Sequence, residues 1–558
     1  MERQMIRCVA VSSILLSLFG SPCASHVFKT SVEKKPRDKI QFAFAKHFQD
    51  HMVLQQAPAK ANIYGFSPDI GQLVTLQITS SPIPIVHQTT VKPGPEAGVG
   101  VWGFTLDPTP ANTTISLKVS SKGTNLTLSD VIFGDVWICS GQSNMEFTVK
   151  MMAPADAAKE LADAHNYPLM RLMTVELQQS TTPLYDLVKV RQPWTPPSNA
   201  SIGGSSWKYF SAVCWLYGKA IHKALGHPIG LIATSWGGTP VEAWSSPQAL
   251  AKCGVGSSGS NHDHNAKDHH FESHSNKLPD EERLQGPGNN SVLWNAMIHP
   301  MLGMTIKGAV WYQGESDSSG TKMDHYNCTF PAMIQDWRNN FNKASNGQTD
   351  DLFPFGFVQL SPYRPNPNIS VGYPDIRWHQ TADHGYVPNT DMLNVFMAVA
   401  MDLPDYNSTY GSIHPQDKKD VGDRLALAGL AIAYGRHVVY EGPFPLNQKI
   451  TSGGLVIDYG KVWNVTVRST DGFELLCVNG SKGTWIPTKI VSNNETSVTL
   501  GLTCSAGQRT AGVRYAWRES PCEFKKCAIY ETVNGLPGPP FVKYLSASGR
   551  GSFYRRRP

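Results

Sequence analysis

The segment 140–145 carries the first residues whose types and spacing could perform nucleophilic chemistry. It follows an apolar run, and Gly141 stands two positions before Ser143. Because glycine permits a sharp turn, such a turn would present the Ser143 hydroxyl and aim backbone N–H groups at a developing oxyanion. The same serine could instead cap a helix after the turn, so spacing alone leaves a catalytic and a structural role open.

A second segment, 233–239, offers a rival nucleophile and a candidate oxyanion donor. Gly237 and Gly238 could bring backbone N–H groups close to a substrate. Ser235 fits the x-x-Ser-x-Gly spacing of a nucleophile elbow, although Ala233 stands where that pattern has its first glycine. We therefore rank Ser235 below Ser143 as a nucleophile.

Polar groups that could assist a serine occur further along the chain. The segment 311–317 places the Gln313 amide and the Glu315 carboxylate after an apolar run. A serine hydroxyl near neutral pH is a poor nucleophile until an imidazole takes its proton. Of the eighteen histidines, His414 is the best placed, because its loop lies between the last strand and the last helix expected in the α/β region. The alternatives are His299 and His379.

Strand and helix patterns that must position these residues alternate along the middle of the chain. Buried strands are expected at 131–139, 229–234, 308–312, 355–360 and 395–401. Helices are expected at 212–225, 293–301, 332–341 and 421–434. This alternation predicts a three-layer α/β domain around a parallel sheet. Reactive groups gather at the carboxyl ends of such strands, because the loops there converge while the sheet holds them.

Three modules are expected after the N-terminal segment. Short alternating runs broken by Gly and Pro predict a β-sandwich at 26–128. The α/β core then spans 129–442, and alternation returns in a second β-sandwich at 443–546. Residues 547–558 are rich in Gly and Arg and are expected to form a disordered tail.

The first residues, 1–25, have the order of a secretory signal peptide. Arg3 and Arg7 precede an apolar run at 9–19, and small residues follow it, so the mature chain is expected to start near His26. N-x-S/T sequons recur behind this segment and support a passage through the secretory pathway, either to the lysosome or out of the cell. They lie at Asn112, Asn125, Asn199, Asn289, Asn327, Asn368, Asn407, Asn464, Asn479 and Asn494.

Composition excludes several classes of protein. The net charge of +5 is small and scattered, so no nucleic-acid partner is expected. No later segment is long and apolar enough for a transmembrane helix, so no membrane insertion is expected. The segment 257–276 holds several histidines, but its Ser-, Asn- and Asp-rich composition favours a surface loop over a metal site. No feature predicts an oligomeric state.

Cysteine usage fits an oxidising compartment. Ten cysteines occur, two of them in the predicted signal peptide, and the remaining even number permits disulfides whose pairing the sequence does not assign. Cys139 lies inside an apolar run and is expected to be a buried free thiol. No C-x-x-C pair occurs, which argues against a structural zinc site or a redox dithiol.

Several motifs taken together resemble the sialate O-acetylesterases, a carbohydrate-esterase branch of the SGNH hydrolase superfamily. The motifs are His-Met-Val-Leu-Gln at 51–55, Gly-Gln-Ser-Asn-Met at 141–145, Gly-Gly-Thr-Pro-Val-Glu-Ala-Trp at 237–244, Trp-Tyr-Gln-Gly-Glu-Ser at 311–316, Ile-Arg-Trp-His-Gln-Thr-Ala-Asp at 376–383 and Gly-Ser-Ile-His-Pro at 411–415. They run in family order over most of the mature chain. Together they are specific, although no single one is.

The resemblance implies a role for each matching residue. Ser143 is expected to be the nucleophile and His414 the general acid and base. The oxyanion is expected to be held by the backbone N–H groups of Ser143 and Gly238 and by the Gln313 side chain, which looks like a replacement for the superfamily's usual Asn. The resemblance implies no metal and no organic cofactor.

The third member of the triad departs from the family pattern. The superfamily pattern D-x-x-H would place Asp at the position of Gly411. Glu315 is the first substitute for orienting His414, since the resemblance places its carboxylate near the site. Other possibilities are Asp402, Asp405, Asp417 or a Ser–His dyad without an acid. Arg377 and Trp378 could contact substrate, while Arg377 could equally be a structural ion-pair partner.

The resemblance points to O-acetylated sialic acids or sialoglycoconjugates as substrates, with the 9-O-acetyl group favoured. The expected reaction is a two-step acyl transfer through an acetyl-enzyme. Two alternatives remain at this stage: an esterase of the same fold that acts on another acetylated glycan such as xylan, and a catalytically silent glycan-binding protein. A third keeps the esterase but makes Ser235 the nucleophile.

Overall fold

The computed structural model describes residues 40–79, 85–256, 286–546 and 550–552 of the chain. From Gln41 onward the chain clusters as one unit. The predicted signal peptide and the predicted histidine-rich loop at 257–276 lie outside the described residues.

The centre of this unit is the parallel sheet that the sequence predicts. Its strand order is β11-β10-β12-β9-β13-β14-β15, and all strands but β11 are parallel to their neighbours. The strands are β9 (Thr124–Gly141), β10 (Met170–Val175), β11 (Val190–Thr195), β12 (Ile229–Ala233), β13 (Gly308–Tyr312), β14 (Phe355–Gln359) and β15 (Val395–Val399). The five expected strands all form. Sequence analysis missed β10 and β11, because polar residues interrupt their apolar runs.

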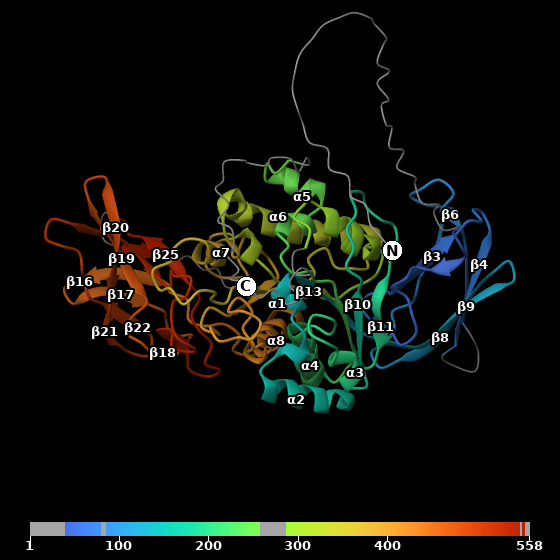
Figure 1. Ribbon diagram of the computed structural model, residues 1–558, viewed down its shortest axis with the longest axis horizontal. Helices are drawn as coiled ribbons and strands as arrows, with labels where there is room; N and C mark the ends of the chain where they lie inside the picture. The colour runs from blue at the N-terminus through green and yellow to red at the C-terminus, as the bar shows by residue number, and fades with distance from the viewer. Residues whose placement is uncertain (1–39, 80–84, 257–285, 547–549, 553–558) are drawn as a thin grey trace, which may run out of the picture. The chain divides into compact units, whose positions relative to one another are not determined.

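Helices cover both faces of this sheet (Figure 1). On one face Tyr217 of α4 (Ala212–Leu225) contacts Trp137 of β9, and α4 packs against α8 (Lys419–Tyr434). On the other, Trp337 of α6 (Gly320–Ala344) contacts Trp311 of β13. The three-layer α/β core is therefore confirmed.

Two expected helices differ from the structure in form or length. The segment expected at 293–301 is a π-helical turn, η5 (Trp294–Ile298), followed by a 3₁₀ turn, η6 (His299–Met301). The helix expected at 332–341 is the middle of α6, which begins at Gly320 and runs through Pro331. Proline usually marks a helix start or a break, because it lacks an N–H donor, but α6 continues through Pro331 and begins well before the predicted start.

The N-terminal β module shares a strand with the core. The first part of β9 pairs antiparallel with β8 (Thr114–Ser121), and its residues Ile132–Gly134 pair with β2 (Val53–Gln55). From Asp135 onward the same strand pairs with β12 and then β13. The boundary predicted between 128 and 129 thus falls inside one continuous strand. Further antiparallel strands complete the module: β1 (Ala43–Phe44), β3 (Asn62–Ser67), β4 (Leu73–Thr79), β5 (Ile85–Thr90), β6 (Lys92–Pro93) and β7 (Gly100–Thr105).

The C-terminal β module holds two antiparallel sheets and a two-stranded ribbon. The sheets have the orders β21-β22-β17-β16-β26 and β20-β19-β23-β25, and the ribbon pairs β18 with β24. The strands are β16 (Asn447–Thr451), β17 (Gly454–Asp458), β18 (Val465–Val467), β19 (Phe473–Asn479), β20 (Lys482–Thr488), β21 (Ile490–Asn493), β22 (Ser497–Leu500), β23 (Arg509–Tyr515), β24 (Ile529–Glu531), β25 (Phe541–Tyr544) and β26 (Arg550–Ser552). Within the predicted tail, residues Arg550–Ser552 form β26 and pair with β16, and the rest of the tail lies outside the described residues.

Within the described ranges four disulfides form, and one of them corrects a prediction. Cys139, at the end of β9, is bonded to Cys214 in the first turn of α4, with the two Cα atoms 5.8 Å apart. The apolar run around Cys139 suggested a free thiol, but only the packing of α4 over β9 brings its partner within disulfide geometry. The other pairs are Cys253–Cys328, Cys477–Cys504 and Cys522–Cys527. None of the described helices has the length and apolar character needed to cross a membrane.

Candidate active site

Ser143 and His414 meet at the carboxyl edge of the parallel sheet. The Ser143 Oγ lies 2.8 Å from the His414 Nε2, although 271 positions separate the two residues in sequence. Their exposed fractions are 5% and 7%, so the pair is almost shielded from solvent. Among the described residues no other serine hydroxyl is hydrogen-bonded to an imidazole, and Ser235 has no such partner.

A glycine turn presents Ser143 at this edge. Strand β9 ends at Gly141, and Ser143 begins the short helix α1 (Ser143–Glu146). Gly141 has a φ of +135°, and a Cβ there would lie 2.2 Å from the carbonyl oxygen of Tyr312. Only glycine fits this conformation and this close approach to the neighbouring strand. The turn therefore has the form that the motif predicts.

His414 is oriented by a backbone carbonyl. Its Nδ1 lies 2.7 Å from the carbonyl oxygen of Tyr410, and the Ser408 hydroxyl donates to the carbonyl of His414 itself at 2.6 Å. A carbonyl oxygen can only accept a hydrogen bond, so Nδ1 must carry the proton. The Nε2 atom is then left as an acceptor for the Ser143 hydroxyl, which is the tautomer that a general base requires.

At Gly411, where the D-x-x-H pattern has Asp, the backbone conformation favours glycine. Gly411 has a φ of +81° with open space around a Cβ position, and the N–H of His414 donates to its carbonyl at 2.9 Å. This tight turn brings the Tyr410 carbonyl to Nδ1. The carbonyl thus occupies the position at the imidazole that the D-x-x-H pattern assigns to an acid.

Burial shifts the pKa of His414 downward, to about 4. Desolvation is the largest cause, and the positive charge of Lys418 acts in the same direction. The hydrogen bond to the Tyr410 carbonyl acts in the opposite direction, since it favours the protonated ring. The imidazole is therefore neutral, and able to accept a proton, over the whole range from mildly acidic to neutral pH.

Asn144 joins the serine turn to the histidine loop. Its amide donates to Glu315 Oε1 at 2.6 Å and to the carbonyl of Ile413 at 2.9 Å, and its Oδ1 accepts from Lys418 Nζ at 2.7 Å. Asn144 is fully buried, so no water competes for these bonds. We call Asn144, Glu315 and Lys418 the Asn144 cluster. It fixes Ser143 relative to His414, because Asn144 follows the serine and Ile413 precedes the histidine.

Lys418 is unusually buried for a lysine. It is fully buried, with its Nζ 4.5 Å from the centre of the Phe147 ring and 5.5 Å from that of Tyr312. Desolvation lowers its pKa to about 7, and the carboxylate of Glu315 opposes that shift. Sequence analysis did not single out Lys418 or Asn144, although Asn144 belongs to a matching motif and could have been found there.

Glu315 lies in this cluster and not against the imidazole, which corrects the expectation that it orients His414. Its Oε1 accepts from Asn144, while its Oε2 has no hydrogen-bond partner among the described residues. Burial raises its pKa. The aspartates that were open alternatives do not contact His414 either: Asp402 pairs with Arg424, Asp405 accepts from the N–H of Gln416, and Asp417 accepts from the N–H of Asp420.

The predicted oxyanion donors divide into two groups. No described residue accepts a hydrogen bond from the backbone N–H of Ser143 or Gly238, and Gly238 is exposed with a φ of +70°. Gln313 is different. Its amide nitrogen donates to the carbonyl of Thr239 at 3.2 Å and to the carboxylate of Asp317.

These two bonds use both N–H groups of Gln313, and its Oε1 accepts from the Tyr326 hydroxyl at 2.9 Å. The side chain is fully buried. This geometry corrects the expectation that the Gln313 amide faces an oxyanion. Because Thr239 adjoins Gly238, Gln313 instead anchors the loop that contains Gly238.

Arg377 also corrects a prediction. It is fully buried in α7 (Tyr373–His379), and its guanidinium donates to the carbonyls of Leu360, Arg518 and Glu519 at 2.7 to 2.8 Å. Such a group cannot reach a substrate. Desolvation lowers its pKa to about 10. Its neighbour Trp378 packs against Trp517, with ring centres 6.0 Å apart. Both residues tie the core to the C-terminal module.

The other histidines considered as bases have structural partners. His299 Nδ1 lies 2.8 Å from the carbonyl of Leu184, and His379 Nδ1 lies 2.6 Å from Asp383 Oδ1. A residue that sequence analysis missed is Trp207, whose half-buried ring lies 5.1 Å from that of His414. Over the described part of the chain, no cluster of three or more His, Cys, Asp or Glu side chains could hold a metal ion.

A serine hydroxyl bonded to an imidazole above a parallel sheet is the arrangement of a serine-dependent hydrolase. Comparisons with known proteins agree with this class. The chain is 42% identical over 519 residues to the human sialate O-acetylesterase, covering 92% of this chain and 94% of that protein. It is 41% identical over 528 residues to the mouse sialate O-acetylesterase, covering 91% and 96%.

Two further comparisons concern the domains. Residues 446–545 match the family model of the sialate O-acetylesterase C-terminal domain. The crystal structure of a carbohydrate acetylesterase from Xanthomonas citri has the same fold, with a TM-score of 0.71 at 24% identity over 90% of this chain and 99% of that one. The chain belongs to the sialate O-acetylesterase family, and it is a carboxylic-ester hydrolase.

Proposed function

We propose that this enzyme removes O-acetyl groups from sialic acids, with Ser143 as nucleophile and His414 as general acid and base. The observation that carries the proposal is the 2.8 Å hydrogen bond between Ser143 Oγ and His414 Nε2, with Nδ1 of the same ring fixed by a carbonyl. The sialate O-acetylesterases to which the chain is similar support the substrate class.

In the first step His414 Nε2 accepts the proton of the Ser143 hydroxyl while Oγ attacks the acetyl carbonyl carbon. The tetrahedral intermediate collapses as the bond between that carbon and the sugar oxygen breaks. The imidazolium then returns its proton to the sugar oxygen. Because the pKa of His414 is lowered to about 4, its protonated form is a strong donor to this leaving group.

In the second step water attacks the acetyl-enzyme. His414 accepts a proton from the water, acetate leaves, and the Ser143 Oγ regains its proton. In both steps the carbonyl oxygen becomes negatively charged. The unbonded N–H groups of Ser143 and Gly238 are the donors that we assign to it, and loss of one such donor costs about 2.7 to 4 kcal/mol in other serine enzymes.

The finer substrate assignment is the acetyl group at the 9-position, on free sialic acid or on a sialoglycoconjugate. An esterase of another acetylated glycan such as xylan is the alternative. The described disulfides fit a folding route through the oxidising secretory pathway. We further propose delivery to the lysosome or secretion, with glycosylation at some of the sequons.

The nucleophile is tested with Ser143→Ala and the matched control Ser235→Ala. Ser143→Ala is expected to abolish acetate release and fluorophosphonate labelling, while Ser235→Ala keeps both. Labelling that persists in Ser143→Ala would overturn the assignment. The substrate is tested by comparing kcat/KM for 9-O-acetyl sialic acid with that for acetylated xylan, and a preference for xylan would overturn the sialate proposal alone.

A further inference from the structure

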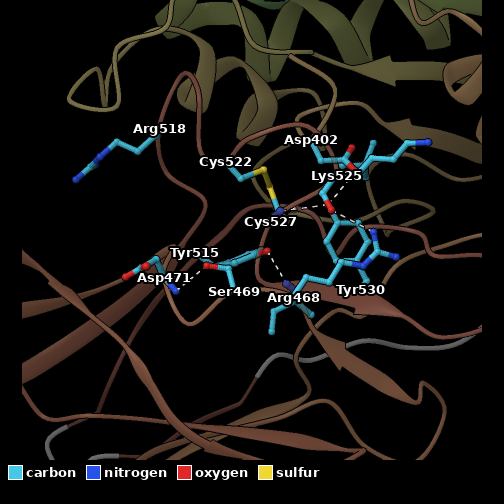
Figure 2. Close-up of a disulfide and its surroundings, with 12 residues drawn as sticks. Asp402, Arg468, Ser469, Asp471, Tyr515, Arg518, Cys522, Lys525, Cys527 and Tyr530 are labelled. Carbon is cyan, nitrogen blue, oxygen red and sulfur yellow. Dashed lines mark hydrogen bonds between the residues drawn. A yellow bond between two sulfur atoms is a disulfide. The ribbon is translucent and has the colours of Figure 1, made fainter. Parts of the chain in front are cut away.

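One small loop of the C-terminal module contacts the start of the segment that carries His414. Asp402 lies just after β15 and is fully buried. The Tyr530 hydroxyl donates to its Oδ2 at 3.0 Å, and the Lys525 N–H donates to its carbonyl at 2.8 Å. Figure 2 shows Lys525 and Tyr530 close to Asp402, beside the Cys522–Cys527 disulfide.

The same loop contacts the end of that segment. The Lys525 ammonium forms an ion pair with Asp420, in the first turn of α8. The N–H of Asp420 donates to Asp417 Oδ1 at 3.1 Å, and Asp417 precedes the buried Lys418 of the Asn144 cluster. Lys525 therefore joins both ends of the segment 402–420, since its backbone reaches the start and its side chain reaches the end.

The disulfide holds Lys525 in place for both contacts. Cys522 and Cys527, five positions apart, close the loop, and the Cys527 N–H donates to the Tyr530 hydroxyl at 3.2 Å. Lys525 has a φ of +56°, a left-handed backbone conformation that costs free energy for residues other than glycine. Arg468 Nη1 donates to the Lys525 carbonyl at 3.2 Å and helps to hold that conformation.

Hydrogen bonds within the segment connect its two anchored ends to the His414 imidazole. Asp405 Oδ2 accepts from the N–H of Gln416 at 3.0 Å, and Ser408 Oγ donates to the carbonyl of His414. The ring itself is oriented by the Tyr410 carbonyl, which belongs to the same segment. No described acidic side chain contacts the ring, so its direction depends on the position of the segment and on the Trp207 ring beside it.

From these contacts we infer that the disulfide-closed loop of the C-terminal module positions His414, and that Lys525 and Tyr530 are positioning residues for acyl transfer. This inference rests on the proposed roles of Ser143 and His414. It gives the C-terminal module a part in the chemical step. A displacement of about 1 Å at a reacting group can cost about a hundredfold in rate, so small movements of this segment matter.

The test compares Lys525→Met, Tyr530→Phe and the double variant with the full-length parent. Lys525→Arg serves as the conservative rescue, and Lys526→Met serves as the control, because Lys526 is exposed and, among the described residues, its ion pair is with Glu523 of the same loop. Hydrolysis of p-nitrophenyl acetate is measured well below the melting temperature of every variant. The double variant is expected to lose about tenfold in kcat, with an unchanged KM and an equal slowing of fluorophosphonate labelling.

Lys525→Arg keeps the positive charge and should lose much less kcat than Lys525→Met. The kcat of Lys526→Met should match that of the parent. A double variant with unchanged kcat, or one whose loss only follows its smaller folded fraction, overturns the inference. Failure of the proposed function has a different signature. If the parent hydrolyses p-nitrophenyl acetate through Ser143 but not acetylated sialic acid, only the substrate is wrong; if Ser143→Ala keeps the activity, the catalytic pair is wrong.

Discussion

The two β modules are attached to the core in different ways and at opposite edges of its sheet. The N-terminal module is joined by the backbone ladder of β9, which pairs with β2 and β8 before it enters the core at Asp135. That entry lies at the amino ends of the parallel strands. Ser143 lies at the other end, after Gly141. This module should therefore affect stability more than catalysis.

The C-terminal module is joined by separate hydrogen bonds and ion pairs at the carboxyl edge, without a shared strand. Arg377 donates to carbonyls of Arg518 and Glu519, and the Glu519 carboxylate accepts from Arg364 Nε at 2.9 Å and Nη2 at 2.6 Å. These contacts reach the segment that follows β14, and the bonds of Lys525 and Tyr530 to Asp402 reach the segment that follows β15. The comparison teaches that a module can affect the reaction without contacting substrate, if it anchors the loops that carry reacting groups.

The largest loss of activity is expected when the base at the carboxyl edge is removed. His414→Ala removes the base and should lower kcat by about 10⁴-fold or more, because Ser143 keeps its proton. The melting temperature should change little beyond the effect of the small cavity. The matched control is His165→Ala at an exposed position, which should leave kcat unchanged. A modest loss in His414→Ala would show that another group acts as base.

Asn144→Ala should have the next largest effect. It leaves the carboxylate of Glu315, the carbonyl of Ile413 and the ammonium of Lys418 without their shared partner. We expect the free energy of unfolding to fall by about 2 to 4 kcal/mol and kcat to fall by about a hundredfold. Denaturant unfolding and steady-state kinetics measure the two effects. An unchanged kcat in folded protein would mean that the cluster does not set the distance between serine and histidine.

A pair of variants sharpens the comparison between the two modules. Arg377→Met removes the donors to three carbonyls at the carboxyl edge, while Gln55→Met removes the 2.8 Å bond from Gln55 Nε2 to Asp135 at the amino edge. Each should lower the free energy of unfolding by about 1 to 4 kcal/mol. Only Arg377→Met should also lower kcat. An equal loss of kcat in Gln55→Met would contradict the distinction between the edges.

The pH dependence follows from the lowered pKa of His414. The acid limb of kcat/KM should have an apparent pKa near 4, so activity should persist at pH 5, where an imidazole of ordinary pKa would be almost fully protonated. The folded pKa is below the unfolded value. The stability contribution of the neutral ring is thus complete above about pH 6.5 and is lost as pH falls through the folded pKa of about 4.

The smallest expected effect is the shift of the acid limb in Lys418→Met, a variant that also leaves the buried Asn144 Oδ1 without its donor. Removing this positive charge should raise the apparent pKa of the acid limb, because the charge of Lys418 is one cause of the depression. Desolvation remains the larger cause, so the limb should stay below pH 6.5. Lys419→Met is the control, since Lys419 pairs at the surface with Asp423. A limb that does not move in Lys418→Met would mean that desolvation alone sets the pKa.

The sequence by itself determined the architecture and the two main residues of the site. Strand β13 has its predicted bounds, Gly308–Tyr312, and helix α4 has its predicted bounds, Ala212–Leu225, because continuous apolar runs and helical periodicity are local properties of the chain. The motif resemblance selected Ser143 and His414, which the folded chain brings to hydrogen-bonding distance.

Tertiary structure alone decided which atoms support this pair. The Tyr410 carbonyl orients His414, while Glu315 binds Asn144 and the amide of Gln313 is used by Thr239 and Asp317. Segments far apart in sequence make these contacts. Hydrogen bonds act over about 3 Å, so their partners depend on where the loops meet, and neither composition nor spacing encodes that position directly.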